Sequence, residues 1–230
     1  MNKVKMTARE AVACVKSGDT ILVGGFGLVG SPLTLIEELT QMDVKDLTIV
    51  SNNIGESGKG LGKILLQGKI KKAIGSYFTS NRDVGEAYGA GKLELELVPQ
   101  GTLAERLRAG GAGIPAFYTP TAYGTDLGVG KETKNFDGRW CVMERHLKGN
   151  VALIRAHKAD TLGNLVYYKT ARNFNPLMAQ AADYVIAEVD EIVEPGQLEP
   201  DEIVTSHLYV NAVVKAEWIL TAEGVKRHNG

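Results

Sequence analysis

The sequence predicts an α/β protein with a mostly parallel open sheet, helices on both faces of that sheet, and a small antiparallel insertion. The first 110 residues alternate four times between an apolar segment of strand length and a segment with helical spacing, which is typical of parallel strands joined by helices. Residues 110–150 interrupt this alternation, because they are rich in glycine, threonine and aromatic residues. We therefore expect one domain, 1–230, with the insertion near 110–150.

The N-terminal segment predicts a helix followed by a buried strand. Thr7 and Glu10 have the spacing of a capping box, in which each side chain bonds the other residue's backbone N–H. Gly18 is expected to end this helix, because glycine adopts the left-handed conformation of a helix terminus without a steric cost. The apolar residues of 19–23 then form the first strand, buried on both faces.

The following elements are expected from the same patterns. Ser31 is a suitable N-cap for the second helix, and Pro32 suits its first turn. The predicted strands are 47–51, 72–77, 93–98, 151–156, 165–168, 183–189 and 208–214. The predicted helices are 33–40, 60–67, 81–90, 102–108 and 175–182. Gly110 and Gly111 are expected to end the helix that starts at residue 102, and residues 135–138 to form a turn between two short strands of the insertion.

Composition excludes several classes of function. The formal net charge of -1 argues against nucleic-acid binding, which requires a basic excess. No apolar run approaches the roughly 20 residues that span a bilayer, and no apolar segment follows the N-terminal lysines as in a secretory signal. Cys14 and Cys141 are far apart, and the four histidines show no metal-ligand spacing. The sequence thus predicts a cytoplasmic protein without a metal, a nucleic-acid partner or a membrane partner.

The segment from Gly24 to Gly30, which follows the first predicted strand, is the strongest candidate for a ligand site. Glycines between a strand and a helix leave backbone N–H groups open to an anion. Gly25, Gly27 and Gly30 have the spacing of a nicotinamide fingerprint, but that motif requires an acidic residue at the end of the second strand, where this chain has asparagines. A tight turn without a ligand is a second interpretation.

A third interpretation is a family resemblance. The motif Gly24-Gly25-Phe26, followed by Gly30 and Pro32, resembles the signature of class I coenzyme A-transferases, and in particular of the first (alpha) subunit of 3-oxoacid CoA-transferases. Three further blocks resemble the same family. They are Ser51-Asn52-Asn53, residues 99–111 and residues 172–176. The resemblance extends from residue 3 to about residue 215, and the tail after it carries no recognisable motif.

This resemblance implies a covalent mechanism. Such enzymes move CoA from an acyl-CoA, typically succinyl-CoA, to a carboxylic acid such as acetoacetate. An enzyme glutamate forms first an acyl–glutamyl anhydride and then a glutamyl–CoA thioester. No metal or redox cofactor is implied, and coenzyme A acts as a substrate. In the family the glutamate lies in a Ser-Glu-Asn-Gly motif, which this chain lacks. We therefore expect no catalytic nucleophile here, and a separate second CoA-transferase subunit that carries it, with two copies of each subunit.

The resemblance also assigns site residues. The cofactor-binding loop would consist of Gly24, Gly25, Phe26, Gly27, Leu28, Val29 and Gly30, which would contact CoA. Asn52, Asn53 and Gln100 would bind the small carboxylic acid, because neutral amides can orient a carboxylate without a permanent ion pair. Each of these three also suits a simple turn or helix entry.

Two other functions stay open from the sequence alone. A sugar-phosphate isomerase of related fold would act as a single chain, and a small-acid-sensing module would be no enzyme. The acidic residues Glu188, Glu191 and Glu194 lack the family's glutamate motif, and we interpret them as a solvated strand end.

Overall fold

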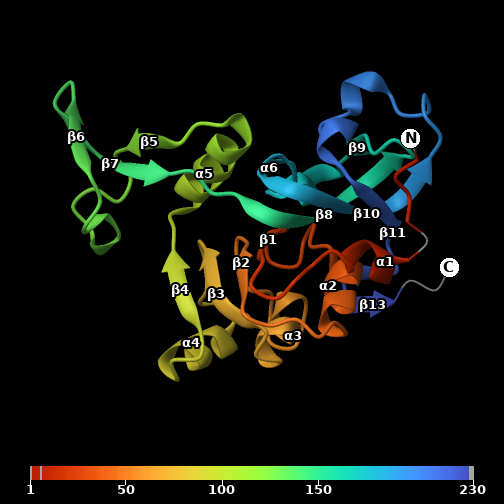
Figure 1. Ribbon diagram of the computed structural model, residues 1–230, viewed down its shortest axis with the longest axis horizontal. Helices are drawn as coiled ribbons and strands as arrows, with labels where there is room; N and C mark the ends of the chain where they lie inside the picture. Colours follow the sequence, from red (N-terminus) through yellow and green to blue (C-terminus); the bar gives the residue numbers. More distant parts are fainter. Residues whose placement is uncertain (1, 6, 228–230) are drawn as a thin grey trace.

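The computed structural model describes residues 2–5 and 7–227, so Met1, Met6 and the last three residues of the tail lie outside the described residues. Its main sheet has the strand order β11-β10-β8-β1-β2-β3-β4, and every neighbouring pair along this order is parallel (Figure 1). The strands of this order are β1 (Thr20–Val23), β2 (Leu47–Val50), β3 (Ile70–Gly75), β4 (Glu94–Leu97), β8 (Gly149–Asp160), β10 (Ala182–Val193) and β11 (Ala212–Lys215). The short strand β9 (Leu165–Val166) pairs antiparallel with β8. The mostly parallel sheet is confirmed.

Helices cover both faces of this sheet, as predicted. Ile21 and Val23 of β1 belong to a core that includes residues of α1 to α4, whereas Leu22 belongs to a second core with residues of α5 and α6. Alternate side chains of a strand point to opposite faces, so the two cores lie on the two sides of the sheet. The helices are α1 (Ala8–Val12), α2 (Leu33–Thr40), α3 (Leu61–Leu66), α4 (Arg82–Gly89), α5 (Gln100–Ala112) and α6 (Asn175–Gln180). Short 3₁₀ helices are η1 (Asp126–Gly128), η2 (Lys169–Arg172), η3 (Pro200–Glu202) and η4 (His207–Tyr209).

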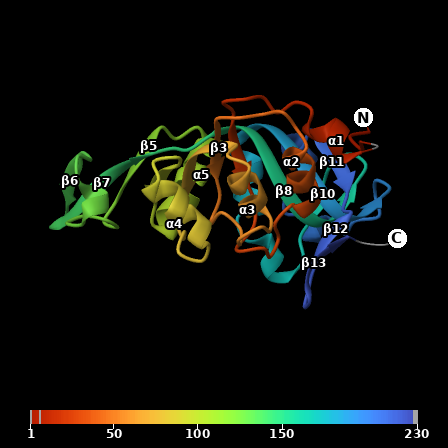
Figure 2. The ribbon, with the colours of Figure 1, turned by 90° about the horizontal axis from the view of Figure 1, so that it is seen from below.

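The antiparallel insertion forms an arm, defined here as residues 116–145. Its strands β5 (Ala116–Thr119), β7 (Arg139–Arg145) and β6 (Thr133–Phe136) pair in that order in a three-stranded antiparallel sheet. Figures 1 and 2 show that it projects away from the main sheet. The predicted turn at 135–138 is present, and the Gly138 N–H donates to Asn135 Oδ1 at 2.9 Å.

The tail contains a hairpin that the sequence patterns do not predict. Strands β12 (Trp218–Thr221) and β13 (Gly224–Arg227) pair antiparallel. The hairpin is tied to α2, because Thr34 Oγ1 accepts hydrogen bonds from the N–H groups of Glu217 at 2.9 Å and of Trp218 at 3.0 Å. This hairpin therefore covers part of the outer surface of α2.

Several predicted boundaries are wrong. Helix α1 ends at Val12, well before Gly18, and the first residues of the predicted strand 208–214 belong to η4. Helix α5 continues through Gly110 and Gly111 and ends at Ala112, with Gly113, whose φ is 73°, as its C-cap. A Cβ atom at Gly110 would lie 2.2 Å from the carbonyl oxygen of Leu147. Glycine at this position permits close packing and does not end the helix.

Candidate functional site

The strand order reverses at β1. From β1 the chain proceeds through β2, β3 and β4 on one side, whereas β8, β10 and β11 occupy the other side. Open α/β sheets bind their ligands at the carboxyl ends of the strands at such a point. The loop from Gly24 to Gly30, called the glycine loop below, directly follows β1 at this edge. The topology therefore places it where a ligand is expected.

The glycine loop contains a tight turn with an exposed tip. The Phe26 N–H donates to the Val29 carbonyl at 2.9 Å, and the Val29 N–H donates to the Phe26 carbonyl at 3.2 Å. Phe26 and Val29 are 49% and 43% exposed, whereas Leu28 is buried. Gly27 at the tip has a φ of 61°, and no hydrogen bond within the described part of the chain uses its N–H group. This N–H group is available to a ligand oxygen.

The glycines of the loop have different roles. A Cβ atom at Gly24 would lie 1.8 Å from Asn175 Oδ1, and a Cβ atom at Gly30 would lie 2.4 Å from the carbonyl oxygen of Ala171. These two glycines let the segment 171–175 pack against the loop. By contrast, a Cβ atom at Gly27 would meet nothing within 4 Å. Gly24 and Gly30 thus serve internal packing, and the open side of the loop is at Gly27.

The structure brings two of the three other predicted site residues into contact. Asn52 Nδ2 donates to Gln100 Oε1 at 3.2 Å. Asn52 and Asn53, which follow β2, are 1% and 6% exposed, and Gln100 at the start of α5 is exposed. Because Leu22 pairs with Val50 in the parallel register, Asn52 lies level with Gly24. Its buried Oδ1 has no hydrogen-bond partner among the described residues. All three residues follow strands on the same sheet edge as the glycine loop.

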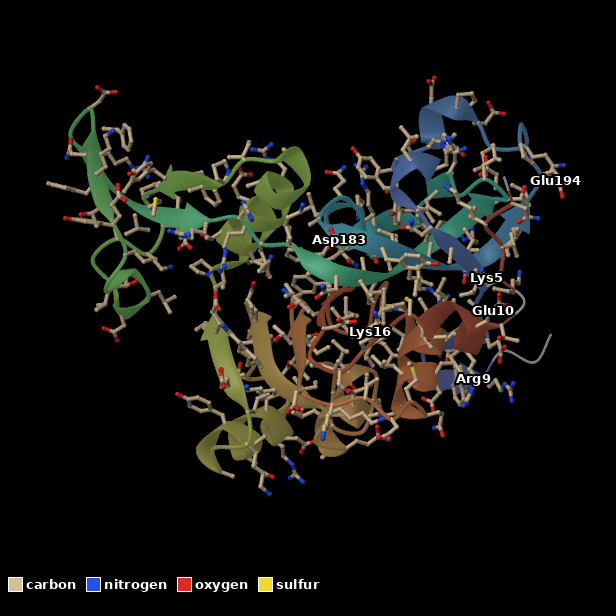
Figure 3. The ribbon with its side chains drawn as sticks, viewed as in Figure 1. Lys5, Arg9, Glu10, Lys16, Asp183 and Glu194 are labelled. Atoms are coloured by element: carbon tan, nitrogen blue, oxygen red, sulfur yellow. The ribbon has the colours of Figure 1, made fainter. Side chains whose placement is uncertain are left out.

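Glu188 differs from its prediction, because it is fully buried. Its carboxylate accepts hydrogen bonds from the N–H groups of Thr34 at 2.8 Å and Leu35 at 3.1 Å, and it forms an ion pair with Arg155. Strand β10 is an interior strand between β8 and β11, so this side chain points to the start of α2 instead of to solvent. Glu191 and Glu194 are exposed, as predicted, and Figure 3 shows Glu194 at the periphery.

The prediction of Ser31 as the N-cap of α2 is also wrong. Pro32 occupies the cap position and provides no side-chain hydrogen bond. Glu188 supplies the missing acceptor from a distant strand, and a carboxylate at a helix N-terminus also interacts favourably with the helix dipole. The start of α2, directly after the glycine loop, is therefore held by β10.

Loss of solvent is the largest influence on the pKa of the buried Glu188 carboxyl group. Burial raises the pKa of Glu188 to about 7, and Arg155 and the two amides of α2 act in the opposite direction. Arg155 also pairs with Asp190 and donates to the carbonyl oxygen of Trp218 at 3.2 Å. His157 Nδ1 lies 3.1 Å from Asp190 Oδ2. With both oxygens engaged and no exposure to solvent, the Glu188 carboxylate cannot act as a nucleophile on a ligand at the loop.

Asn173 and Asn175 are functional candidates that the sequence patterns did not identify. Asn175 is fully buried, and its Nδ2 donates to the carbonyl oxygen of Gly30 at 3.0 Å while its Oδ1 accepts from the Arg155 N–H at 2.9 Å. Asn173 contacts the loop at two points, described below. The sequence points to this segment only through the resemblance of residues 172–176 to a block of the family, which does not indicate what the two asparagines contact.

A small cavity lies beside the loop. Its volume is about 190 Å³, and its walls include Leu28 and Val29 of the loop, Leu33 of α2, and Ile219 and Leu220 of the tail hairpin.

Within residues 2–5 and 7–227, no group of three His, Cys, Asp or Glu side chains is placed to bind a metal ion. None of the helices in the described ranges has the length and apolar character needed to cross a bilayer.

Comparisons with known proteins agree on one family. Residues 5–216 match the family described as Coenzyme A transferase. The chain is 53% identical over 214 residues to the first subunit of a probable succinyl-CoA:3-ketoacid coenzyme A transferase of Bacillus subtilis (strain 168), covering 93% of this chain and 90% of that protein. It is 52% identical over 217 residues to the corresponding subunit of the succinyl-CoA:3-ketoacid coenzyme A transferase of Helicobacter pylori (strain J99 / ATCC 700824), covering 94% of each.

A solved structure shows the same fold. This is an acyl-CoA transferase of E. coli O157:H7 in a thioester complex with CoA, with a TM-score of 0.79 and 21% sequence identity. The match covers 94% of this chain but only 47% of that chain, so this chain spans about half of its length.

Proposed function

The chain belongs to the coenzyme A transferase family, and we propose that it is the first (alpha) subunit of a heteromeric 3-oxoacid CoA-transferase of the cytoplasm. The reaction moves CoA from succinyl-CoA to a 3-oxoacid such as acetoacetate. The nucleophilic glutamate belongs to a second subunit, and the assembly contains two copies of each. The names of the two relatives, each of which designates one subunit of a succinyl-CoA:3-ketoacid coenzyme A transferase, support the substrate pair and the existence of a partner.

One observation carries the proposal that the site is incomplete. The glycine loop lies at the switch point with an open backbone N–H at Gly27, while the buried carboxylate behind it, Glu188, is fully engaged by Arg155 and the start of α2. The loop can receive a thioester oxygen, but Glu188 cannot attack the thioester carbon. A nucleophile from another polypeptide would complete the site.

In the proposed sequence of steps, the partner's glutamate carboxylate attacks the thioester carbon of the acyl-CoA. This forms an acyl–glutamyl anhydride and releases CoA as a thiolate. The thiolate then attacks the glutamyl carbonyl of the anhydride, which releases the first carboxylic acid and leaves a glutamyl–CoA thioester. The second acid reverses both steps, so that atoms and charge balance over the cycle.

This chain would bind and orient the reactants. The Gly27 N–H would donate a hydrogen bond to an oxygen that gains negative charge as the tetrahedral centre forms, which is the usual role of a backbone amide at an oxyanion. Asn52 and Gln100 would hold the small acid through neutral amides: Asn52 Nδ2 donates to Gln100 Oε1, and the Nε2 of the exposed Gln100 would donate to the carboxylate of the acid.

The decisive experiment is a transfer assay with and without the partner. The chain is purified alone and as a complex captured with its second subunit, and each is mixed with succinyl-CoA and acetoacetate. We expect acetoacetyl-CoA to form only with the complex. Turnover by the single chain, or isomerisation of a sugar phosphate by the single chain, would contradict the proposal in favour of an enzyme that acts alone.

A further inference from the structure

We propose that Asn173 is a positioning residue for CoA transfer, because its side chain holds both sides of the turn that presents Gly27. This inference rests on the proposed function. The inference extends the proposed function to a residue that lies outside the glycine loop and would contact neither the thioester nor the nucleophile.

The contacts of Asn173 join the two sides of the turn. Its Oδ1 accepts a hydrogen bond from the Gly25 N–H at 3.1 Å, and its Nδ2 donates to the carbonyl oxygen of Val29 at 3.0 Å. Gly25 precedes the Phe26–Val29 turn, and Val29 closes it. One amide group therefore fixes the separation of the two ends of the turn, and with it the direction of the Gly27 N–H.

The backbone of Asn173 is strained in a way that supports this role. Its φ of 21° and ψ of -121° lie in a region that residues other than glycine rarely adopt. Such strain persists where the surroundings impose it, and it concentrates at functional sites. Here the Asn173 N–H donates to the carbonyl oxygen of Thr170 at 3.2 Å, and Asn173 Oδ1 accepts from the Phe174 N–H at 2.7 Å. These bonds direct the side chain at the loop.

The neighbouring residues hold Asn173 in place. Asn175, two positions on, bonds to Gly30 and to β8, and the carbonyl oxygen of Ala171 approaches Gly30 where a Cβ atom would not fit. Asn175 is fully buried, so its role is to dock the segment. Asn173 is more exposed than Asn175 and reaches the exposed part of the loop, which makes it the residue whose loss would alter the loop without removing its support.

The chemistry of the contact requires one donor and one acceptor on the same group. An asparagine amide provides both, whereas an ionised aspartate offers only acceptors and would repel the Val29 carbonyl oxygen. A protonated aspartate has a carbonyl and a hydroxyl, and therefore restores the pattern. This difference allows the role of the side chain to be tested by pH.

The test uses the complex with the second subunit, with succinyl-CoA and acetoacetate as substrates. Asn173→Gly removes the amide and is compatible with the positive φ, and Asn173→Asp makes the contact depend on pH. Asn150→Ala is the matched control, because Asn150 Oδ1 accepts from the Thr20 N–H at 2.8 Å at the opposite end of β1.

We expect Asn173→Gly to lower kcat/KM by about 100-fold, the scale of a misplacement of about 1 Å, with little change in Tm. Asn150→Ala should keep the kcat/KM of the unsubstituted complex. The activity of Asn173→Asp, divided by that of the unsubstituted complex at the same pH, should rise as the pH falls. The rise should approach about tenfold per pH unit while the aspartate is mostly ionised.

The outcomes separate this inference from the proposed function. If the unsubstituted complex transfers CoA and Asn173→Gly keeps its kcat and KM, the positioning role is refuted while the proposed function stands. A flat activity ratio for a folded Asn173→Asp, or a loss of activity that follows a loss of folding in both variants, would reduce Asn173 to a structural role. An inactive unsubstituted complex would refute the proposed function and this inference with it.

Discussion

The amide groups at the start of α2 are satisfied by a residue from another part of the chain. Glu188 lies 154 positions beyond Thr34 in the sequence, yet its carboxylate bonds the N–H groups of both Thr34 and Leu35. Burying a carboxylate is unfavourable unless it is paired and hydrogen-bonded, and here Arg155 and these two amides provide the partners. Single residues at this edge thus depend on partners that lie far away in the sequence.

Replacing Glu188 by glutamine is expected to remove a pH dependence of stability. Burial raises its pKa from 4.5 to about 7, so the folded state binds this proton more tightly than the unfolded state. The resulting stabilisation is fully present below about pH 4.5 and is lost as the pH rises through about 7. From about pH 5.5 to about pH 8.5, the unfolding free energy of the unsubstituted chain minus that of Glu188→Gln should fall by about 2 kcal/mol.

Urea unfolding at several pH values measures this difference. Glu191→Gln, at an exposed position of the same strand, is the control and should show no such fall. A difference for Glu188→Gln that stays constant over the same range would show that the carboxylate is ionised throughout.

Gly27 and Gly68 permit a matched test of the glycine loop. Their φ values are 61° and 68°, and a Cβ atom at either would meet nothing within 4 Å. Asparagine tolerates this conformation, so Gly27→Asn and Gly68→Asn should both fold. In the assembled enzyme only Gly27→Asn places a side chain over the open loop, and it should raise the KM for succinyl-CoA by about tenfold or more, which corresponds to about 1.4 kcal/mol. Equal KM values for the two variants would show that the loop does not contact CoA.

Among the elements, the arm is the most independent. Its strands pair only with one another among the described residues, and few of its residues, Cys141 and Val142 among them, are buried. Neither core of the main sheet contains a residue of 116–145. The chain leaves and returns at one point, because the His146 N–H donates to the Pro115 carbonyl oxygen at 3.2 Å. Its described links to the body include a hydrogen bond from Arg106 on α5 to the carbonyl oxygen of Arg145 at 2.9 Å.

Replacing residues 116–145 by two glycines should therefore leave the main sheet folded. We expect a cost of less than about 2 kcal/mol, which for a chain of this size is a decrease in Tm of less than about 8 °C. Circular dichroism with thermal melting measures this. Loss of the cooperative transition would show that the arm is part of the folding unit.

At the scale of the whole molecule, the proposed site lies at the point where the two halves of the sheet meet. The first half supplies the glycine loop, Asn52 and Gln100, and the second supplies Asn173, Asn175 and Arg155 through β8 and the segment that follows it. The open side of this site has a bare amide and neutral side chains but no free carboxylate among the residues described above. This asymmetry is the structural basis for proposing that a second subunit completes it.

Local patterns in the sequence were sufficient for much of the fold. The apolar segments predicted the strands of the parallel sheet. Thr7 is the predicted cap of α1, since its side chain accepts from the Glu10 N–H. These features depend on residues within a few positions of one another. The glycine loop was found for the same reason.

The remainder depended on tertiary structure. Glu188 resembled a solvated residue because it is charged and lies at the end of the predicted strand 183–189, but the order β11-β10-β8 places it inside. Gly110 resembled a helix end, but it lies inside α5, where the absence of a Cβ atom allows close contact with the carbonyl oxygen of Leu147. The hydrogen bond between the Asn173 side chain and the Gly25 N–H joins residues 148 positions apart. The sequence by itself determined most of the helices and strands and the position of the glycine loop, because these follow from neighbouring residues. Only the tertiary structure decided which side chains are buried and which hold the loop, because these depend on contacts between distant segments.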